Sequence, residues 1–174
     1  MKKYVVAAIV LIALAGLAKL AGLYVGARSA LSAVEVEAHQ HHMPTGFFGV
    51  SWLDSTDALL AARPSVVPVS DSMVGESVQY LGRPAQINYY VKGGNVLMFA
   101  IHFAGVASEA VFQAANQSLD QEYGPMSSPK HENDDFGPKY CSHRQSGRFN
   151  IDHCMRLQEQ VLHESVVFYR SKPR

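Results

Sequence analysis

Charged side chains are scarce in this 174-residue chain, and neither sign of charge prevails. They make up 17% of the residues, against about 25% in a typical soluble domain, and 15 Lys and Arg balance 15 Asp and Glu. This composition excludes a highly charged disordered segment and a strongly basic nucleic-acid-binding domain. We therefore expect no nucleic-acid partner and a chain long enough to bury one hydrophobic core.

Signatures of catalysis are also lacking. The sequence contains no G-x-S-x-G, no H-E-x-x-H and no glycine-rich phosphate loop. A cysteine hydrolase would need a free thiol, and the two cysteines of the chain can pair with each other. Asp54 and Asp57 lie where a helix starts, and Asp152 faces a histidine across a hairpin. Both positions are explained by structural roles, so these carboxylates do not indicate catalysis. We expect a non-enzymatic protein, and a small hydrolase is the weakest hypothesis.

The N-terminal segment carries basic residues but no acid, and it is strongly apolar. Between Tyr4 and Ala27, 20 of 24 residues are apolar. Residues 1–27 are therefore predicted to be a membrane anchor or an uncleaved signal that forms a transmembrane helix, with residues 4–25 in the lipid bilayer.

Three residues fit the two membrane interfaces. Tyr4 and Tyr24 are 20 residues apart, and a helix of that length spans about 30 Å, the thickness of the bilayer core. Lys19 is close enough to the outer interface for its side chain to reach the polar layer. These positions favour a retained anchor over a cleaved signal.

The positive end of such a segment stays in the cytoplasm. The chain is therefore predicted to be a single-pass protein of the bacterial inner membrane, with its C-terminal domain in the periplasm. The alternative is cleavage of the signal, which would release a secreted form; Ala13-Leu14-Ala15 is a triplet of the cleavable type. The segment has no nearby cysteine, which excludes a lipid-modified bacterial lipoprotein.

Residues 28–45 are predicted to be a polar stalk between the membrane and the folded domain. This stalk contains His39, His41, His42 and Met43, whose imidazoles and thioether could capture copper, nickel or zinc. A flexible linker lacks the surrounding hydrogen bonds that make a metal site selective. Metal handling by this cluster is therefore the alternative function, and otherwise no cofactor is expected.

Residues 46–174 are predicted to fold as an extracytoplasmic α+β domain. Cap residues and prolines mark two helices, at residues 54–63 and 108–123. Residues 124–138 form a long loop. Each helix is followed by three strand candidates, which gives a tandem α-β-β-β antiparallel sheet with two helices packed on one face. The candidates are residues 65–70 continuing to 73–81, 85–91, 96–104, 139–144, 148–157 and 161–171.

The turn at Gly93-Gly94-Asn95 can be assigned a register. A three-residue loop pairs Ile87 with Ile101, Tyr89 with Phe99 and Val91 with Leu97, so that the apolar faces of the two strands coincide. A two-residue turn would instead pair Phe99 with a polar residue. We therefore predict the three-residue loop.

The element order, the Gly49-Val50-Ser51-Trp52 entry to the first helix and the Glu122-Tyr123-Gly124-Pro125 end of the second resemble a known group of proteins. These are the small exported α+β modules of the beta-lactamase inhibitory protein and of the SmpA/OmlA outer-membrane assembly lipoproteins. The resemblance covers roughly residues 46–171. It implies a protein-binding or assembly module without a catalytic site, although the lipid-attachment cysteine of the lipoproteins is missing.

Cys141 and Cys154 can be interpreted in two ways. A hairpin turning at Ser146-Gly147 sets them directly opposite each other, where a disulfide can form. Together with His143 and His153 they also supply four nitrogen and sulfur ligands of the kind that zinc uses. Strand alternation turns His153 to the other face, so we favour the disulfide.

A partner surface is expected on the sheet face turned away from the core. Tyr90, Met98 and His102 alternate with core residues, and Trp52 and the 124–138 loop with Asp134 and Asp135 could extend this surface. The predicted function is a non-enzymatic, membrane-anchored periplasmic protein that binds another protein or serves as an accessory or assembly subunit of an envelope membrane complex.

Overall fold

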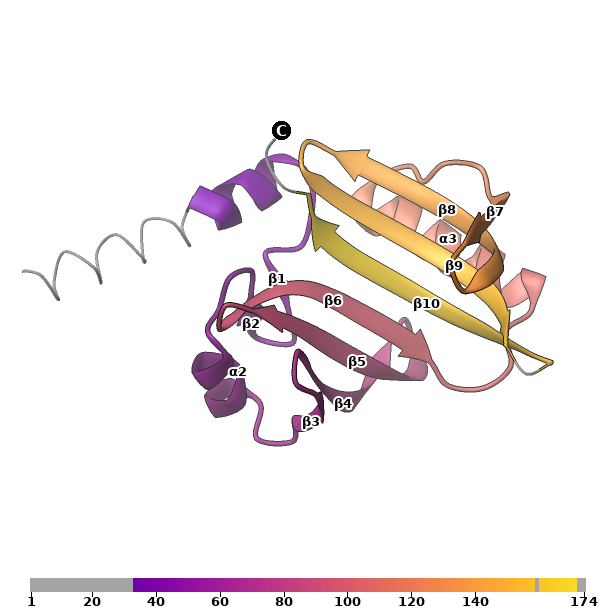
Figure 1. Ribbon diagram of the computed structural model, residues 1–174. Coiled ribbons are helices and arrows are strands. Elements are labelled where there is room, and N and C mark those ends of the chain that lie inside the picture. Colours follow the sequence, from indigo (N-terminus) through magenta and orange to yellow (C-terminus); the bar gives the residue numbers. More distant parts are fainter. Residues whose placement is uncertain (1–32, 159, 172–174) are drawn as a thin grey trace, which may run out of the picture.

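An eight-stranded antiparallel sheet dominates the computed structural model, which describes residues 33–158 and 160–171 (Figure 1). The strand order is β3-β4-β5-β6-β10-β9-β8-β7, and β1 and β2 form a separate two-stranded hairpin. Residues 33–40 are helical. The other elements are β1 (Gly46–Phe47), β2 (Val50–Ser51), α2 (Thr56–Ala62), β3 (Val67–Ser70), β4 (Met73–Tyr80), β5 (Arg83–Lys92), β6 (Asn95–Phe103), α3 (Glu109–Tyr123), β7 (Lys130–Asp134), β8 (Gly137–Ser146), β9 (Phe149–Gln158) and β10 (Val161–Arg170).

The sheet is built from two consecutive halves. In each half a helix precedes four antiparallel strands, β3 to β6 after α2 and β7 to β10 after α3. The last strands of the halves, β6 and β10, pair at the centre of the sheet, so the first strands lie at its two edges. The unit is therefore α-β-β-β-β, with one strand more than the sequence predicted.

The additional strands are the two edge strands. β3 and β4 were expected as one element, and β7 lies within the predicted 124–138 loop. All four residues of β3 are exposed and four of the five in β7 are exposed, so neither strand carries the alternating burial that marks a strand in a sequence. Pro68 also fits an edge position, where the missing N–H costs no ladder bond.

The membrane part of the predicted fold class is corrected. In the described residues, no helix combines the length and the apolar character needed to cross a membrane. The predicted transmembrane helix and the inner-membrane single-pass localisation therefore have no support in the described residues. The predicted anchor (1–27), with Tyr4, Lys19, Tyr24 and the bilayer contact at residues 4–25, lies outside the described residues.

The hydrophobic core covers one face of the sheet and joins the two halves. Trp52, 1% exposed, packs against Phe99 of β6 at 4.6 Å and Phe149 of β9 at 5.7 Å between ring centroids. Tyr123 of α3 contacts Phe168 of β10 at 5.5 Å. Figure 1 shows α3 behind the sheet, on the face away from the viewer, and the buried residues of α2 and of residues 33–40 belong to the same core cluster.

The β5–β6 turn gives most of the predicted apolar pairs, but it does so with a two-residue turn and a bulge in place of the predicted three-residue loop. Ile87 pairs with Ile101 and Tyr89 with Phe99, as the sequence predicted. The turn is the shorter Gly93-Gly94 type, because Lys92 pairs with Asn95, and a bulge next to Tyr90 then restores the register. The third predicted pair is wrong, since Val91 faces Val96.

The described part of the predicted stalk, residues 33–45, packs against the sheet domain. Val34, Ala38 and Met43 are buried in the core. The Glu37 carboxylate accepts hydrogen bonds from Arg148 at 2.6 and 2.8 Å and from Arg170 at 2.7 Å. These contacts make residues 33–45 part of the folded domain, whereas the sequence predicted a stalk that only separates the domain from the membrane.

Candidate functional site

The candidate site lies on the face of the sheet that points toward the viewer in Figure 1. We call it the open face, because the helices of the described residues all pack on the opposite side. Strand alternation assigns Met98 of β6, Val167 of β10, Asp152 of β9 and Cys141 of β8 to this face. These strands are neighbours, so their side chains form one continuous surface.

A hollow of about 340 Å³ lies at the centre of the open face. Met98, Val167 and Tyr169 are half-buried and supply its apolar wall. The remaining lining residues are Asp134, Lys139, Asp152, Cys154, Arg156 and Ser165. The hollow therefore combines an apolar wall with a polar margin contributed by β7, β8 and β9.

The predicted partner residues are only partly brought together. Met98 lines the hollow, Tyr90 pairs with it across β5 and β6, and Asp134 lies at the margin. His102 is exposed further along β6 and does not line the hollow. Asp135 is exposed in the β7–β8 turn.

Trp52 does not belong to this surface. Its side chain is 1% exposed in the core, and its indole N–H donates to the carbonyl oxygen of Pro44 at 2.6 Å. The sequence placed Trp52 beside a short helix but could not show which side of the sheet the segment before that helix covers. The prediction that Trp52 contacts a partner is therefore wrong.

A disulfide joins Cys141 and Cys154 at the edge of the hollow, with an S–S distance of 2.11 Å. The two residues are direct partners across β8 and β9, which is the pairing that the hairpin predicted. Cys141 is fully buried, and Cys154 is half-buried and lines the hollow.

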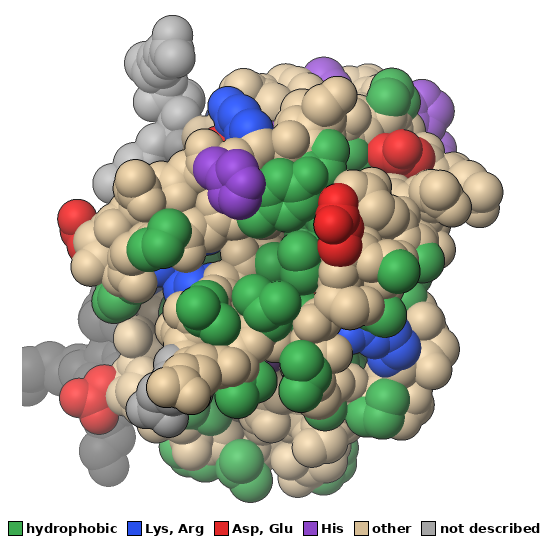
Figure 2. All heavy atoms as spheres, turned by 90° about the vertical axis from the view of Figure 1, so that its right-hand side faces the viewer, with side chains coloured by type: hydrophobic (Ala, Val, Ile, Leu, Met, Phe, Trp, Pro, Cys, Tyr) green, Lys and Arg blue, Asp and Glu red, His purple; other side chains and the backbone are tan. Residues whose placement is uncertain are grey.

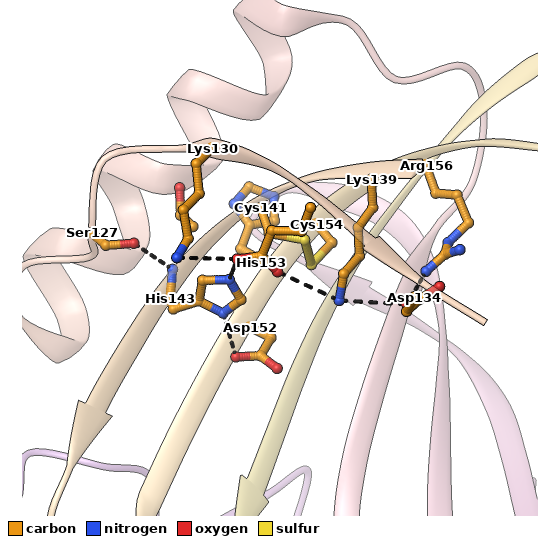
Figure 3. The surroundings of a disulfide bond; sticks show 12 residues. Ser127, Lys130, Asp134, Lys139, Cys141, His143, Asp152, His153, Cys154 and Arg156 are labelled. Atoms are coloured by element: carbon orange, nitrogen blue, oxygen red, sulfur yellow. Dashed lines mark hydrogen bonds and ion pairs between the residues drawn. A yellow bond between two sulfur atoms is a disulfide. The ribbon is translucent and has the colours of Figure 1, made fainter. Parts of the chain in front are cut away.

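His143 lies beside the disulfide between two carboxylates (Figure 3). Its Nδ1 is 2.8 Å from an Asp152 oxygen, and its Nε2 is 2.8 Å from an oxygen of Glu132 on β7. Both ring nitrogens can donate only when the imidazole is protonated. The arrangement therefore places a histidine and two acids within one hydrogen-bonded group on the open face.

Ion pairs neutralise the charged groups around the hollow. Burial raises the pKa of Glu132, but hydrogen bonds from His143 and Lys130 outweigh it and hold this pKa below its usual value. Hydrogen bonds from Arg156 and from the Phe136 backbone N–H hold the pKa of Asp134 far below its usual range. Burial next to Asp152 raises the pKa of Tyr169 to about 12.

Glu132 was missed as a site residue. Its segment was expected to belong to a long loop, residues 124–138, which contains three prolines and the acidic run at residues 132–135. Lys130, Glu132 and Asp134 do alternate as charged residues, and the structure turns them to the same face as Cys141 and Lys139. This alternation of charge was the available signal.

The geometry does not assemble a nucleophile. The Ser127 hydroxyl accepts from the His143 backbone N–H at 2.9 Å and is not bonded to the ring. Both ring nitrogens are engaged by carboxylates, and both cysteines are in the disulfide. A serine or cysteine nucleophile needs a free hydroxyl or thiol next to a base. The arrangement is suited to binding.

His153, the other member of the sequence-predicted zinc set, lies on the covered face. Its ring is fully buried and stacks on Phe112 of α3 with centroids 4.0 Å apart. Nδ1 is 2.7 Å from the Asn116 side-chain oxygen and Nε2 is 2.9 Å from Glu164, whose other oxygen is 2.7 Å from Arg83. This buried polar network is structural and was not foreseen.

The imidazoles of the His39–Met43 cluster do not converge. His41 Nδ1 is 3.0 Å from the Ser146 hydroxyl, and the Met43 sulfur accepts from Arg144 at 3.4 Å. His39, His42 and Met43 line another hollow of about 340 Å³. Within the residues that the structure describes, the group of three or more metal-type ligands that does converge is Glu132, Cys141 and His143.

A second hollow, of about 440 Å³, lies at the end of the molecule on the covered side. Figure 2 shows apolar side chains gathered at this end. Its lining includes Tyr140, Met155, Leu157 and Leu162, and Leu157 is 58% exposed. Lys139 lines both hollows, and His131 and Pro138 of the predicted 124–138 loop lie at this end of the molecule. The lining does not include Tyr90, Met98, His102, Asp134 or Asp135.

Comparison of the sequence with protein-family models and with curated proteins finds no match. Among solved structures, the chain is similar to a DUF4309 family protein, YjgB, from Bacillus subtilis. The identity is 11%, the TM-score is 0.48, and the alignment covers 81% of this chain and 95% of that protein. This distant likeness indicates nothing about function.

Proposed function

We propose that this protein is a non-enzymatic binding module that docks another protein on the open face of its sheet, as an accessory subunit of a complex. The observation that carries the proposal is the hollow at the centre of that face, with Met98, Val167 and Tyr169 half-buried around it. Aromatic and apolar side chains that the fold leaves partly exposed around a concave surface are typical anchors of protein interfaces.

The charges around the hollow indicate the chemistry of the partner. Arg156 and Lys139 pair with Asp134, and Asp152 is hydrogen-bonded to His143, so each acid of the margin already has a polar partner. An incoming charge would have to break one of these pairs. A partner that presents an aromatic or large aliphatic side chain, flanked by uncharged hydrogen-bonding groups, fits both the apolar wall and the paired margin.

The test compares two apolar positions in the full-length chain. Met98→Asp places a charge in the hollow, and Leu157→Asp places the same charge in the exposed patch at the end of the molecule. Affinity capture identifies the partner with the unmodified protein, and titration with the purified partner then gives Kd for each variant. We expect at least a tenfold weaker Kd for Met98→Asp and an unchanged Kd for Leu157→Asp.

The proposal is abandoned if Leu157→Asp weakens binding and Met98→Asp does not, because the interface would then lie at the end of the molecule. It is also abandoned if every captured protein binds both variants like the unmodified chain. Circular dichroism and thermal melts establish that each variant is folded.

A further inference from the structure

The open face contains an unassigned group of metal-type ligands around the disulfide (Figure 3). Glu132 of β7 and Cys141 and His143 of β8 place a carboxylate oxygen, a sulfur and a ring nitrogen all within 4.8 Å of one another. The disulfide adds the sulfur of Cys154 from β9. The four donors come from three neighbouring strands on one side of the sheet; three of them already converge, and the sulfur of Cys154 is held next to that of Cys141 by the disulfide.

We propose that these four residues form a zinc site when the disulfide is reduced. Zinc prefers four tetrahedral ligands at about 2.0–2.3 Å, so its ligand atoms lie about 3–4 Å from one another. The three donors that converge lie up to 4.8 Å from one another, so they and the Cys154 sulfur have to draw closer together to reach that geometry. Reduction allows this movement, because it releases the two sulfur atoms from their bond. The same side chains thus serve a disulfide under oxidising conditions and a metal ion under reducing ones.

The two states are linked by a balanced reaction. A dithiol reductant gives two electrons and two protons to the disulfide, leaves Cys141 and Cys154 as thiols, and is itself oxidised to a disulfide. Zinc then binds the two thiolates, and the thiol protons pass to solvent. The imidazole must give up its Nε2 proton as well, since a neutral ring is the ligand.

Asp152 already occupies the position of a supporting residue. A histidine that binds a metal through one ring nitrogen almost always donates the other N–H to a carboxylate or carbonyl. The Nδ1 of His143 lies 2.8 Å from Asp152, whereas its Nε2 points at Glu132, another member of the ligand set. The ring is therefore oriented for metal binding through Nε2.

The surrounding charges also suit zinc. Zn²⁺ with two thiolates and one carboxylate has a net charge of −1, which would be costly on a partly buried surface. Lys130 and Lys139 lie 3.3 and 3.7 Å from the Glu132 carboxylate and would offset that charge. The structure thus replaces the ligand set suggested by the sequence: His153 lies on the covered face, and Glu132 takes its place.

Zinc alone is the probe. The full-length protein is reduced with a phosphine, and Zn²⁺ is titrated in competition with a chromophoric chelator; Co²⁺ in a parallel sample reports tetrahedral thiolate coordination by its absorption spectrum. We expect one equivalent of zinc to bind the reduced protein and none to bind the oxidised protein at the same concentration. Asp152→Asn should weaken the zinc affinity of the reduced protein about 10–100-fold.

Matched variants identify the ligands. His143→Ala and Glu132→Gln each remove a ligand, and His131→Ala removes an exposed histidine from the same hairpin on the opposite face. We expect the first two to lose at least tenfold in affinity and His131→Ala to bind like the unmodified protein. Equal binding by all three variants would place the zinc elsewhere and overturn the proposal.

Two further results would contradict the proposal. One is a reduced, folded protein that binds no zinc. The other is a reduced chain that unfolds, by circular dichroism, and does not refold when zinc is added. The zinc test is separate from the partner-binding test, because it needs no partner and uses the reduced protein.

Discussion

The two halves of the sheet share one plan but differ in what they carry. Each has a serine-capped helix followed by four antiparallel strands, and each places a glutamate in the buried side of its sheet. The first half has a helix of seven residues, whereas the helix of the second half has 15. The disulfide and the hydrogen-bonded acids around His143 belong to the second half alone.

The first half therefore serves mainly as a scaffold, and most of the candidate site belongs to the second half. The first half contributes Met98 to the hollow on the open face, and the second half supplies the other lining residues. The second half also has the longer helix, α3, and a disulfide between β8 and β9. Both stabilise the strands that carry the charged groups of the open face. Arg83 and Glu164 then tie the halves together, since they come from β5 and β10.

The largest effect is expected from removing the ion pair between Arg83 and Glu164. Glu164→Ala should lower the free energy of unfolding by about 3–5 kcal/mol, because it leaves the fully buried His153 and the largely buried Arg83 without their carboxylate. Chemical denaturation at neutral pH measures the loss. The double variant Glu164→Ala/Arg83→Met should lose less than the sum of the two single variants, because one uncompensated charge is removed with the other.

A loss below about 1 kcal/mol for Glu164→Ala would contradict this prediction, since it would mean that water or a rearranged side chain replaces the carboxylate at little cost. Purely additive losses in the double variant would show that Arg83 and Glu164 act independently. In that case the two halves would be held together by the β6–β10 pairing and the apolar core around Trp52, without a contribution from this ion pair.

The sequence predicted the parts of both halves in which burial alternates. The second helix, the central strands and the opposition of Cys141 and Cys154 follow from apolar periodicity and from turn residues. The edge strands β3 and β7 could not be found in this way, because they are exposed on both faces. Glu132 was missed for the same reason, and its role depends on a strand pairing that only the folded chain shows.

It was harder to predict on which face of the sheet a side chain lies than to predict which residues form strands. Alternation assigned Met98 and His102 correctly to the face opposite Phe99. Trp52 and Met43 lie in irregular segments, which have no such rule, and the structure buries both. Long-range hydrogen bonds such as those from His153 to Asn116 and Glu164 join residues 37 and 11 positions apart and leave no local pattern.

The buried acid of the first half should matter less than Glu164 and should depend on pH. Burial raises the pKa of Glu76, but hydrogen bonds from Arg63, Ser65 and Tyr89 outweigh it and hold the pKa below its ordinary value of 4.5. Glu76→Gln keeps some of these hydrogen bonds but loses the charge next to Arg63, 2.7 Å away. We expect a loss of about 1–3 kcal/mol at pH 7.

The pH dependence has a definite sign. Because the folded-state pKa is lower than the unfolded one, the carboxylate contributes its full stability above about pH 4.5 and loses it as the pH falls through the folded pKa. The difference in unfolding free energy between the unmodified protein and Glu76→Gln should therefore shrink steadily below pH 4.5. Urea denaturation between pH 3 and pH 7 measures it, and a constant difference would show that the ionised carboxylate contributes nothing.

The smallest effects concern the two helix caps, and they test whether the halves unfold as one unit. The Ser55 hydroxyl accepts from the Ala58 N–H at 3.1 Å, and the Ser108 hydroxyl accepts from the Val111 N–H at 3.3 Å. Replacing either serine with alanine should cost about 1 kcal/mol. If both halves unfold together, each variant lowers the global unfolding free energy by that amount, as measured by denaturation and by exchange of the slowest amides. If Ser55→Ala accelerates exchange only in α2 to β4, the first half opens independently of the second. The two halves would then differ in their free energy of opening as well as in the residues of the candidate site.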